Sequence, residues 1–361
     1  MNIVRWGMIG AGNVTEIKSG PAFQRVQHSS LVAVMRRTPG LAADYAQRHG
    51  IARHYDRARE LIRDPEVDAV YIATPPGSHA ELALMACEAG KPAYVEKPMG
   101  RHYPECQRML EAFSARGVPL FVAYYRRRLP RFLAVKAILA AQRLGRISRV
   151  QYRYAKAPWK DDRGQLPWRL RAEHAGGGLF LDVGCHALDL IDYLFGPILE
   201  VEGTAANLSG VYDVEDQVAM SFQLAGAAAG AATWNFTADR PEDVLEITGA
   251  DGSMRMSVFG NEPVALDILG EPTQLIDRPN PVHIQEPLIQ SIVDELRGEG
   301  LCPSTGASAA RTSRVIDTVL DQYYGGRADP FWERPESWPG RQVLPETGIG
   351  PGSDGAPHDQ R

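Results

Sequence analysis

The stretch GMIGAGNVT, residues 7–15, decides how the first third of this chain is interpreted. Gly10 and Gly12 match the first two glycines of the G-x-G-x-x-G/A pattern, which turns a strand tightly into a helix and lets a pyrophosphate approach the backbone. The third position holds Thr15, where a small residue is expected for close packing of the helix on the strand. On its own the motif is compatible with a phosphate-binding turn or an ordinary glycine turn, so the surrounding pattern decides.

Short apolar runs alternate with helical patterns up to about residue 123. The apolar runs are IVRWGMIG from residue 3, LVAVM from 31, DAVYIAT from 68, PAYVEKP from 92 and PLFVAYY from 119. This alternation predicts a parallel sheet with helices on both faces, and ligands of such sheets bind at the carboxyl ends of the strands. The stretch at 7–15 then has a strand before it and a helix after it, which favours the phosphate-binding turn.

The second half of the chain has a different hydrophobic pattern. After a helical segment over 129–144 come alternating stretches such as ISRVQYRYA, VAMSFQLA and GAATWNFTA, typical of antiparallel strands with one solvated face. We predict helices over 178–195, 283–297 and 306–324. The expected architecture is therefore α/β followed by α+β: a Rossmann domain over 1–123, an α+β domain over 124–330 whose helix near 306–324 packs back on the first, and a Pro- and Gly-rich surface tail over 331–361.

Composition limits the class of protein. The 361 residues have room for two domains, and the formal net charge of -5 argues against general binding to nucleic acid or a membrane surface. The four cysteines form no C-x-x-C pair, and no leader pattern or run of about 18 apolar residues occurs. We expect a cytoplasmic protein that acts on a small molecule and binds neither nucleic acid nor membranes.

The end of the second predicted strand favours NADP as the cofactor. NAD enzymes of this architecture place an acid there to hold the ribose hydroxyls, whereas this chain has Arg36, Arg37 and Thr38. Two guanidinium groups suit the extra phosphate of NADP, and a carboxylate would repel it. The alternatives are NAD as cofactor and a role for both arginines as solvated loop charges.

Two further motifs end predicted strands at the edge where ligands gather. In ATPPGSH, residues 73–79, Ser78 is a candidate helix N-cap with Glu81 completing a capping box, and His79 is expected to hold the turn. This turn is purely structural or also lines the nicotinamide side of a cofactor. In EKPM, residues 96–99, burial would lower the pKa of Lys97 and let it exchange a proton with a substrate hydroxyl; the alternative is an exposed lysine paired with Glu96.

The stretch GGGLFLDVGCHALDL, residues 176–190, offers an acid and base pair. In a helix after the glycines, Asp182 and His186 would share one face with Asp189. A carboxylate beside an imidazole would stabilise its charged form and fix its tautomer, as a general acid and base requires. A structural helix pair or half of a metal site is the alternative, although the other histidines lack ligand spacing and no metal is expected.

YYRRRLPR, residues 124–131, is the one basic cluster of the chain. It follows a predicted Rossmann strand in an acidic chain, so we interpret it as part of the site rather than as a nucleic-acid patch. Tyr124 and Arg126 are expected to face the site, and the remaining arginines to be solvated or at an interface.

The order GMIGAGNVT, ATPPGSH, EKPM and GGGLFLDVGCHALDL resembles the glucose-fructose oxidoreductase and inositol dehydrogenase family, Gfo/Idh/MocA, from the first strand to about residue 330. The resemblance implies that Lys97 contacts the cofactor ribose and the reacting hydroxyl, that Asp182 holds the family's acidic position, and that His186 is the acid and base. It also implies a cis bond before Pro98, and an open C-terminal sheet that forms a homodimer or homotetramer.

The same resemblance places PWR, residues 167–169, in a substrate-side loop. The expected cofactor-binding residues are Gly10, Gly12, Asn13, Val14, Arg36, Arg37, Thr38, Thr74, Pro75, His79, Glu96 and Lys97. The expected substrate residues are Tyr124, Arg126, Trp168, Arg169, Asp182 and His186, of which Asp182 and His186 are, with Lys97, the catalytic ones.

The implied reaction is hydride transfer between a nicotinamide cofactor and a hydroxyl or carbonyl carbon of a sugar, polyol or related compound. Two alternatives of the same fold are an NAD-dependent glycoside-cleaving enzyme and a non-catalytic regulator that senses a sugar or cofactor. The acid and base residues argue against the regulator, and the two arginines after the second strand argue against the NAD-dependent enzyme.

Overall fold

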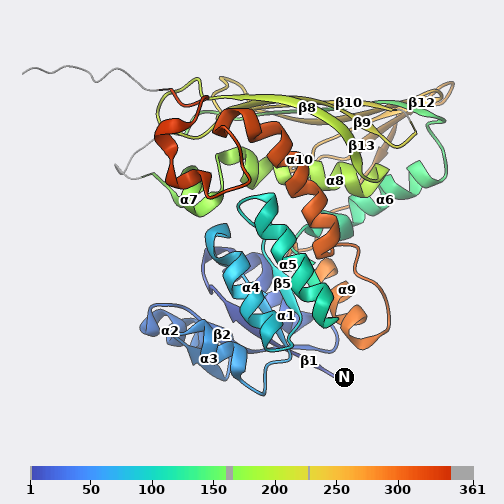
Figure 1. Ribbon diagram of the computed structural model, residues 1–361. Helices are drawn as coiled ribbons and strands as arrows, with labels where there is room; N and C mark the ends of the chain where they lie inside the picture. The colour runs from blue at the N-terminus through green and yellow to red at the C-terminus, as the bar shows by residue number, and fades with distance from the viewer. Residues whose placement is uncertain (1, 160–165, 227, 343–361) are drawn as a thin grey trace, which may run out of the picture.

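The computed structural model of the protein describes residues 2–159, 166–226 and 228–342, so the end of the predicted tail, 343–361, lies outside the described residues. Two sheets organise the chain. The N-terminal half surrounds a parallel sheet in the lower part of Figure 1, and the C-terminal half builds a larger sheet above it. The predicted fold class, a Rossmann unit followed by an α+β unit, is confirmed.

The N-terminal sheet has six strands in the order β3-β2-β1-β4-β5-β6, and all of its pairs are parallel. Its strands are β1 (Val4–Ile9), β2 (Ser29–Met35), β3 (Arg53–Tyr55), β4 (Ala69–Ile72), β5 (Ala93–Val95) and β6 (Leu120–Val122). The chain order reverses between β1 and β4, and the crevice beyond the carboxyl ends of these two strands is where such sheets bind ligands.

Helices cover this sheet because its strands are apolar on both sides; every residue of β4, β5 and β6 is buried. The helical segments are the π-helical turn η1 (Thr15–Ser19), α1 (Gly20–Arg25), α2 (Pro39–His49), α3 (Ala58–Arg63), the 3-10 turn η2 (Pro76–Ser78), α4 (His79–Glu88) and α5 (Tyr103–Arg116). Gly50 and Gly117 end α2 and α5 in the left-handed conformation.

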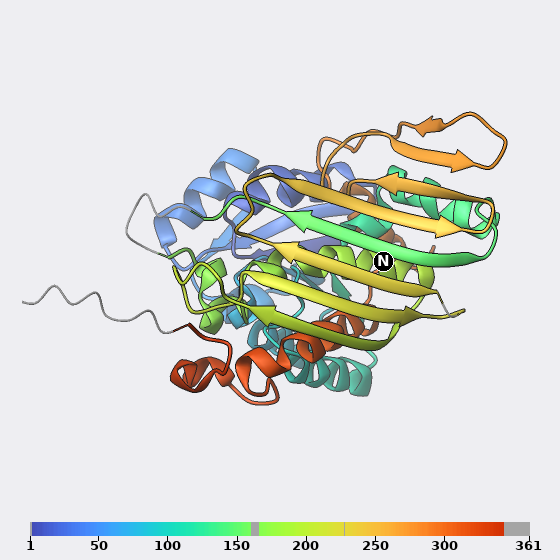
Figure 2. The ribbon, with the colours of Figure 1, turned by 90° about the horizontal axis from the view of Figure 1, so that it is seen from above.

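The C-terminal sheet has eight strands in the order β14-β13-β12-β11-β7-β10-β9-β8. Its neighbours are antiparallel except for the parallel pair β7 and β10. The strands are β7 (Ile147–Ala155), β8 (Ile198–Ala206), β9 (Gln217–Leu224), β10 (Ala229–Asn235), β11 (Glu242–Gly249), β12 (Gly252–Met256), β13 (Val264–Ile268) and β14 (Gln274–Ile276). Figure 2 shows one broad face of this sheet uncovered by any helix.

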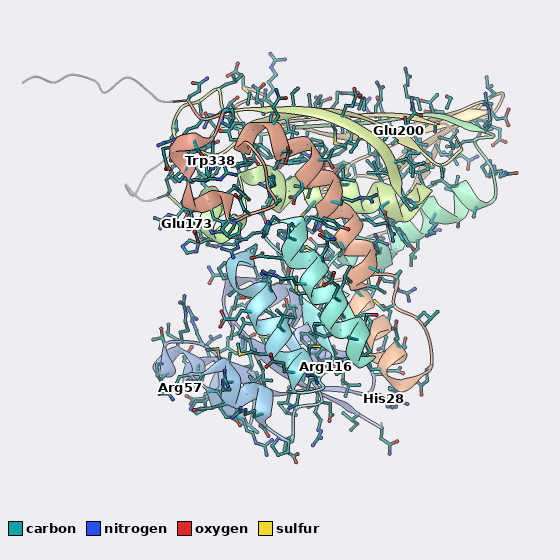
Figure 3. All side chains as sticks on the ribbon, in the orientation of Figure 1. His28, Arg57, Arg116, Glu173, Glu200 and Trp338 are labelled. Carbon is teal, nitrogen blue, oxygen red and sulfur yellow. The ribbon has the colours of Figure 1, made fainter. Side chains whose placement is uncertain are left out.

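Strict alternation along β9 and β10 explains that open face. Their buried residues, Val218, Met220, Phe222 and Trp234 among them, point to the helices, whereas the intervening residues are exposed. Figure 3 labels Glu200, an exposed residue of β8, on the upper sheet above the helices. The sheet therefore has one core face and one free face.

The helices that follow β6 are η3 (Tyr125–Arg128), α6 (Pro130–Ala140), η4 (Trp168–Leu170), α7 (Ala172–Ala175), η5 (Phe180–Gly184), α8 (Cys185–Phe195), α9 (Glu286–Arg297), α10 (Gly306–Tyr324), η6 (Phe331–Glu333) and η7 (Pro335–Ser337). Most of them lie between the two sheets, whereas α9 packs beside α1 of the lower unit (Figure 1). Helix α10, red in Figure 1, contacts β8 of the upper sheet and α5 of the lower unit. It therefore ties the two halves together.

Local signals explain α10 well. The Thr305 side chain accepts from the Ser308 backbone and the Ser308 side chain from the Thr305 backbone, which is a capping box, and Gly325 ends the helix in the left-handed conformation. The first part of the predicted tail packs on this helix, because Trp338 is buried against Tyr324 and donates Nε1–H to the Phe331 carbonyl at 2.8 Å. Each helix in the described ranges is too short or too polar to cross a lipid bilayer.

Candidate active site

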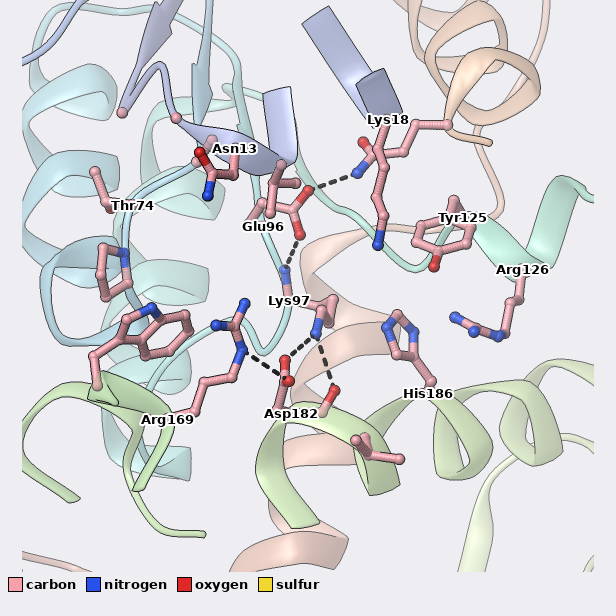
Figure 4. Close-up of a pocket in the computed structure, with 18 of the residues that line it drawn as sticks. Asn13, Lys18, Thr74, Glu96, Lys97, Tyr125, Arg126, Arg169, Asp182 and His186 are labelled. Carbon is pink, nitrogen blue, oxygen red and sulfur yellow. Dashed lines mark hydrogen bonds and ion pairs between the residues drawn. The ribbon is translucent and has the colours of Figure 1, made fainter. Parts of the chain in front are cut away.

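A cavity of about 480 Å³ lies beyond the carboxyl ends of β1, β2, β4 and β5, where the lower unit faces the upper one. Its volume is in the usual range for a small-molecule or cofactor site. Figure 4 shows it in close-up. The lining residues are Gly10, Gly12, Asn13, Val14, Lys18, Arg36, Ala73, Thr74, Pro75, Glu96, Lys97, Tyr125, Arg126, Trp168, Arg169, Asp182, Val183, His186, Phe259 and Gln285.

The glycine turn after β1 forms one wall. Gly10 has a φ of +92°, and a Cβ there would lie 2.9 Å from the backbone of Ala73, so only glycine fits. A Cβ on Gly12 would meet only the Gly10 carbonyl, at 3.7 Å, so the protein leaves the space beside Gly12 open. Asn13 and Val14 follow at the start of the helical segment, where backbone N–H groups lack partners within the helix.

Thr15, the departure from the glycine pattern, is accommodated by the turn itself. Its buried hydroxyl donates to the Gly12 carbonyl at 2.8 Å and accepts from the Gly12 N–H at 3.0 Å. The segment that follows is the π-helical turn η1, and a Cβ on Gly20 would collide with the Thr15 carbonyl. The same space beside Gly20 admits the Tyr45 hydroxyl, which donates to the Thr15 carbonyl at 2.9 Å.

The end of β2 brings only part of the predicted basic group to the cavity. Arg36 is half-buried and lines it, whereas Arg37 and Thr38 are exposed and do not. No carboxylate from the end of β2 lines the cavity. Positive charge therefore marks this end of the site.

In the turn after β4, Thr74 and Pro75 line the cavity, and His79 does not. The His79 ring is fully buried and both of its nitrogens contact backbone carbonyls, those of Thr74 at 2.8 Å and Pro98 at 3.0 Å. His79 thus holds the turn, as predicted. The predicted capping box is wrong, because the Ser78 hydroxyl donates to Thr74 Oγ1 at 2.8 Å instead of capping α4.

Lys97 and Asp182 meet across the cavity. Lys97 Nζ donates to Asp182 Oδ1 at 2.5 Å and to the Asp182 carbonyl at 2.9 Å, and Arg169 Nε donates to Asp182 Oδ2 at 3.0 Å (Figure 4). The predicted cis bond before Pro98 is present. Lys97 follows β5 of the lower unit and Asp182 lies in η5, so the contact joins residues 85 positions apart.

The pKa of Lys97, which pairs with Asp182, differs from the sequence prediction. Burial alone would lower the pKa of Lys97, but the charge and hydrogen bond of Asp182, with smaller effects of Cys185 and Glu96, together outweigh burial and the pKa is raised. Burial would likewise raise the pKa of Asp182, and Lys97 and Arg169 instead hold it below its usual value. The prediction of a lysine with a lowered pKa is wrong, and the site holds an ammonium and a carboxylate.

The predicted pairing of Asp182 with His186 is also wrong. Both oxygens of Asp182 are taken by Lys97 and Arg169, and the π-helical turn η5 ends between Asp182 and His186, so ideal α-helical spacing does not apply. Neither His186 nitrogen has a hydrogen-bond partner in the described part of the chain, and Nδ1 is buried. Burial and the positive charges of Arg126, Lys97 and Lys18 lower the pKa of His186 well below its usual value. His186 is thus a neutral imidazole in a cationic pocket.

Asp189, which the helical spacing placed near His186, faces another way. Its carboxylate is fully buried and pairs with Arg127 Nη2 at 2.7 Å, and Asp192 accepts from the same nitrogen at 3.1 Å. Arg127 is therefore a buried structural residue, and the prediction that it is solvated or at an interface is wrong.

The basic cluster after β6 brings Arg126 to the cavity but not Tyr124. Tyr124 is buried behind His186, with ring centroids 6.1 Å apart, and Tyr125 lines the cavity in its place. The 3-10 turn η3 begins at Tyr125 and changes the direction of the side chains. Arg126 lies over the rings of Tyr125 and Phe259, at 4.9 and 4.3 Å.

Glu96 is held in a buried network rather than paired with Lys97 Nζ. Its Oε1 accepts from Tyr71 at 2.7 Å and from Gln285 Nε2 at 2.6 Å, and Gln285 Oε1 accepts from Tyr94 at 2.7 Å. Glu96 Oε2 accepts from the Lys97 backbone N–H at 3.2 Å. This network fixes the backbone that carries Lys97.

Six lining residues were not predicted: Lys18, Ala73, Tyr125, Val183, Phe259 and Gln285. Lys18 follows Val14 at helical spacing, and Ala73 and Val183 adjoin predicted site residues. These three residues could therefore have been predicted from their positions in the sequence. Phe259 and Gln285 come from segments without a motif, and only tertiary folding brings them in. In the described ranges, no group of three or more His, Cys, Asp or Glu side chains could hold a metal ion.

Two family models match the chain. A model of an oxidoreductase family with an NAD-binding Rossmann fold matches residues 4–124, and a model of the GFO/IDH/MocA C-terminal domain matches residues 132–255. Together they cover both sheets except the last strands of the upper one.

Individual proteins agree with these models. Oxidoreductase P35 of Formosa agariphila is 34% identical to this chain over 323 residues, which are 87% of this chain and 97% of that protein. Trans-1,2-dihydrobenzene-1,2-diol dehydrogenase of Sus scrofa is 28% identical over 83% of this chain and 85% of its own. Among solved structures, a levoglucosan dehydrogenase in complex with NADH and L-sorbose has the same fold, with a TM-score of 0.81 and 22% identity over 88% of this chain and 96% of that chain.

Proposed function

The chain belongs to the Gfo/Idh/MocA family of oxidoreductases with an NAD-binding Rossmann fold, and from this premise we propose that it uses NADP to oxidise or reduce a sugar, polyol or related small molecule. The observation that carries the proposal is the contact of Lys97 with Asp182 in the same cavity as the glycine turn and His186. One cavity therefore contains both a backbone turn suited to a nucleotide and side chains suited to proton transfer.

The residues of the lower unit fit a dinucleotide. Gly12 leaves its side of the turn open, and the first N–H groups of the helix at Asn13 and Val14 suit a pyrophosphate. Thr74, Pro75 and Lys97 line the continuation of the cavity toward the upper unit. When bound, the nicotinamide supplies the acceptor or donor of hydride at the substrate carbon.

Lys97 and His186 have complementary protonation states. The ammonium of Lys97, anchored by Asp182, can hold a substrate oxygen and stabilise negative charge as it develops there. The neutral imidazole of His186 can accept the hydroxyl proton during oxidation, and as an imidazolium it can return a proton during reduction. Asp182 is a positioning residue, because it orients Lys97 and Arg169.

We propose NADP rather than NAD because of Arg36. Its guanidinium lines the cavity at the end of β2, and no carboxylate follows that strand to repel a 2′-phosphate. The proposed location is the cytoplasm. The four cysteines are free and buried, which suits a reducing compartment.

We also propose that two copies of the chain associate through the open face of the upper sheet, as a homodimer or as part of a homotetramer. Toward the β8 edge, that face carries small exposed side chains, Ala219 and Ser221 on β9 and Ala229 and Ala231 on β10, which allow close approach of a second sheet. Light scattering after size exclusion should give a multiple of 39.6 kDa. Ala231→Arg should reduce the mass to one chain; an unchanged mass would exclude this face.

The direct test of the reaction is NADP-linked oxidation of a panel of aldoses, polyols, dihydrodiols and anhydrosugars, followed by NADPH absorbance. The variants are Lys97→Met and His186→Asn, and Lys156→Met is a matched control, because Lys156 does not line the cavity. Each site variant should lower kcat by about a hundred- to ten-thousand-fold, the usual contribution of a proton-transferring group. Turnover near wild type in either variant would contradict its assigned role.

A further inference from the structure

Arg126 lines the cavity and has hydrogen-bond donors that no described residue uses. The side chain is only 4% exposed, and its Nε donates to the Val258 carbonyl at 3.0 Å. Nη1 is buried without a hydrogen-bond partner, and Nη2 donates to no residue in the described part of the chain. Nε therefore fixes one side of the guanidinium, whereas the two Nη groups lack partners and Nη1 is closed off from solvent.

The guanidinium is also held in place by aromatic rings. Its carbon lies 4.3 Å from the centre of the Phe259 ring and 4.9 Å from that of Tyr125, and both rings line the cavity. Such a side chain loses little conformational entropy when a ligand binds, because its position is already determined. The donors are thus preorganised.

The lining residues provide no negative charge for Arg126. The two carboxylates among them, Asp182 and Glu96, are engaged elsewhere: Asp182 with Lys97 and Arg169, and Glu96 with tyrosine and glutamine side chains. Lys18 adds a second positive charge without an ion-pair partner among the described residues. Asp243 accepts from the N–H of Val258, whose carbonyl Arg126 binds, but in the described residues no carboxylate forms a direct ion pair with Arg126. An anionic ligand in the cavity would supply that direct partner.

Arg126 lies at the substrate end of the cavity. In Figure 4, it is on the far side of His186 from Asn13 and Thr74, which mark the cofactor end. A group held by Arg126 would therefore lie next to the proposed acid and base rather than at the pyrophosphate.

We propose that Arg126 binds a carboxylate on the substrate, so that the enzyme acts on a sugar acid, a hexuronate or a related polyhydroxy acid, rather than on a neutral sugar. This inference rests on the proposed function and names its substrate class. The two unpartnered Nη groups match the two oxygens of a carboxylate, and a small shift of the side chain on binding would expose the buried Nη1 for the second contact. Arg126 is a binding residue in this account, and Lys97 and His186 handle the proton.

The test compares matched substrates that differ only at carbon 6. We would measure kcat/KM with NADP for D-glucuronate and D-glucose, for D-galacturonate and D-galactose, and for D-glucose 6-phosphate as the phosphate arm. The variants are Arg126→Gln and Arg126→Lys. Arg128→Gln is the matched control, because Arg128 lies on the same turn with a buried, unpaired Nε but does not line the cavity.

We expect the wild-type enzyme to prefer at least one acid over its neutral partner by ten-fold or more. Arg126→Gln should reduce that ratio about 10- to 100-fold, the loss typical of a charged hydrogen-bonded pair, and Arg126→Lys should reduce it less. Arg128→Gln should keep the wild-type ratio. If Arg126→Gln folds poorly, the Arg126→Lys result carries the comparison.

Three results would overturn the inference: equal or better turnover of the neutral sugars, an acid preference that survives Arg126→Gln, or a preference for glucose 6-phosphate over both acids. In each of them NADP-linked turnover persists, so the proposed function stands. If no sugar is turned over, calorimetric titration into NADPH-loaded protein decides, because D-glucuronate must bind at least ten-fold more tightly than D-glucose. Failure to bind NADPH at all would contradict the proposed function and, with it, this inference.

Discussion

Asp182 lies 2.5 Å from the ammonium of Lys97 and is not the partner of His186, four residues further along the chain. The contact links the end of β5 in the Rossmann unit to η5 beneath the C-terminal sheet. Because Asp182 pairs with Lys97, its carboxylate does not stabilise a charged imidazole at His186, and the imidazole stays neutral. The site therefore combines a fixed positive charge with an uncharged base, an arrangement suited to removing a proton from a hydroxyl.

The glycine turn allows a matched pair of substitutions. Gly10→Ala should lower the free energy of unfolding by about 1–3 kcal/mol, because φ is +92° and the new Cβ would meet the Ala73 backbone. Gly12→Ala should change stability by less than about 0.5 kcal/mol, because only the Gly10 carbonyl lies near. It should nevertheless weaken NADP binding at least ten-fold. Urea unfolding and fluorescence titration measure the two effects, and wild-type affinity in Gly12→Ala would mean that no cofactor approaches the turn.

Arg36 and Arg37 form a second matched pair. Arg36→Ala should weaken binding of NADP by about 10- to 100-fold and of NAD by much less, because only NADP carries the phosphate that a guanidinium would hold. Arg37→Ala should leave both affinities close to wild type, since this side chain is exposed and does not line the cavity. Equal losses for the two cofactors in Arg36→Ala would show that Arg36 does not recognise the 2′-phosphate.

His186 should remain neutral down to a pH well below 6.5 in the protein without cofactor. Burial and three nearby positive charges lower its pKa, whereas in the unfolded chain it titrates near 6.5. NMR of the imidazole C–H signals, assigned by comparison with His186→Gln, measures this directly. A midpoint at or above 6.5 would contradict the neutral base.

The same shift has a consequence for stability. Between the two pKa values, the unfolded chain binds a proton at His186 and the folded protein does not, so stability falls as the pH drops below about 6.5. His186→Gln should lose less stability over that interval than the wild type. Thermal unfolding between pH 7.5 and 5 compares the two, and parallel curves would mean that His186 is not the residue responsible.

Features with local causes were predictable from the sequence. The helix predicted over 306–324 coincides with α10, whose capping pair and terminal glycine lie within a few residues of its ends. Gly10, Gly12 and Lys97 were found because strand ends in a parallel sheet gather at one edge. The fold class followed from the change of periodicity near the middle of the chain.

Features that depend on residues distant in the sequence, or on irregular turns, could not be predicted from the sequence. Ideal helical spacing suggested that Asp182 and His186 interact, but a π-helical turn and the ammonium of Lys97, 85 residues earlier, redirect the carboxylate. Burial alone suggested a lowered pKa for Lys97, and the charge and hydrogen bond of the same carboxylate are the main causes that reverse the shift. The 3-10 turn η3 begins at Tyr125, and Tyr125 lines the cavity instead of the predicted Tyr124. In the first two cases a tertiary partner outweighed a local pattern, and in the third an irregular turn did.

A kinetic double-mutant cycle tests the central relationship most directly. With a substrate from the panel, kcat/KM would be measured for Lys97→Met, Asp182→Asn and His186→Asn, and for the double variants of Asp182→Asn with each of the other two. The structure predicts strong coupling of Asp182 to Lys97, so adding Asp182→Asn to Lys97→Met should lower kcat/KM little further. The fold-reductions in kcat/KM caused by Asp182→Asn and His186→Asn should instead multiply in the double variant. Coupling of Asp182 to His186 instead, with independent effects of Asp182 and Lys97, would contradict the account.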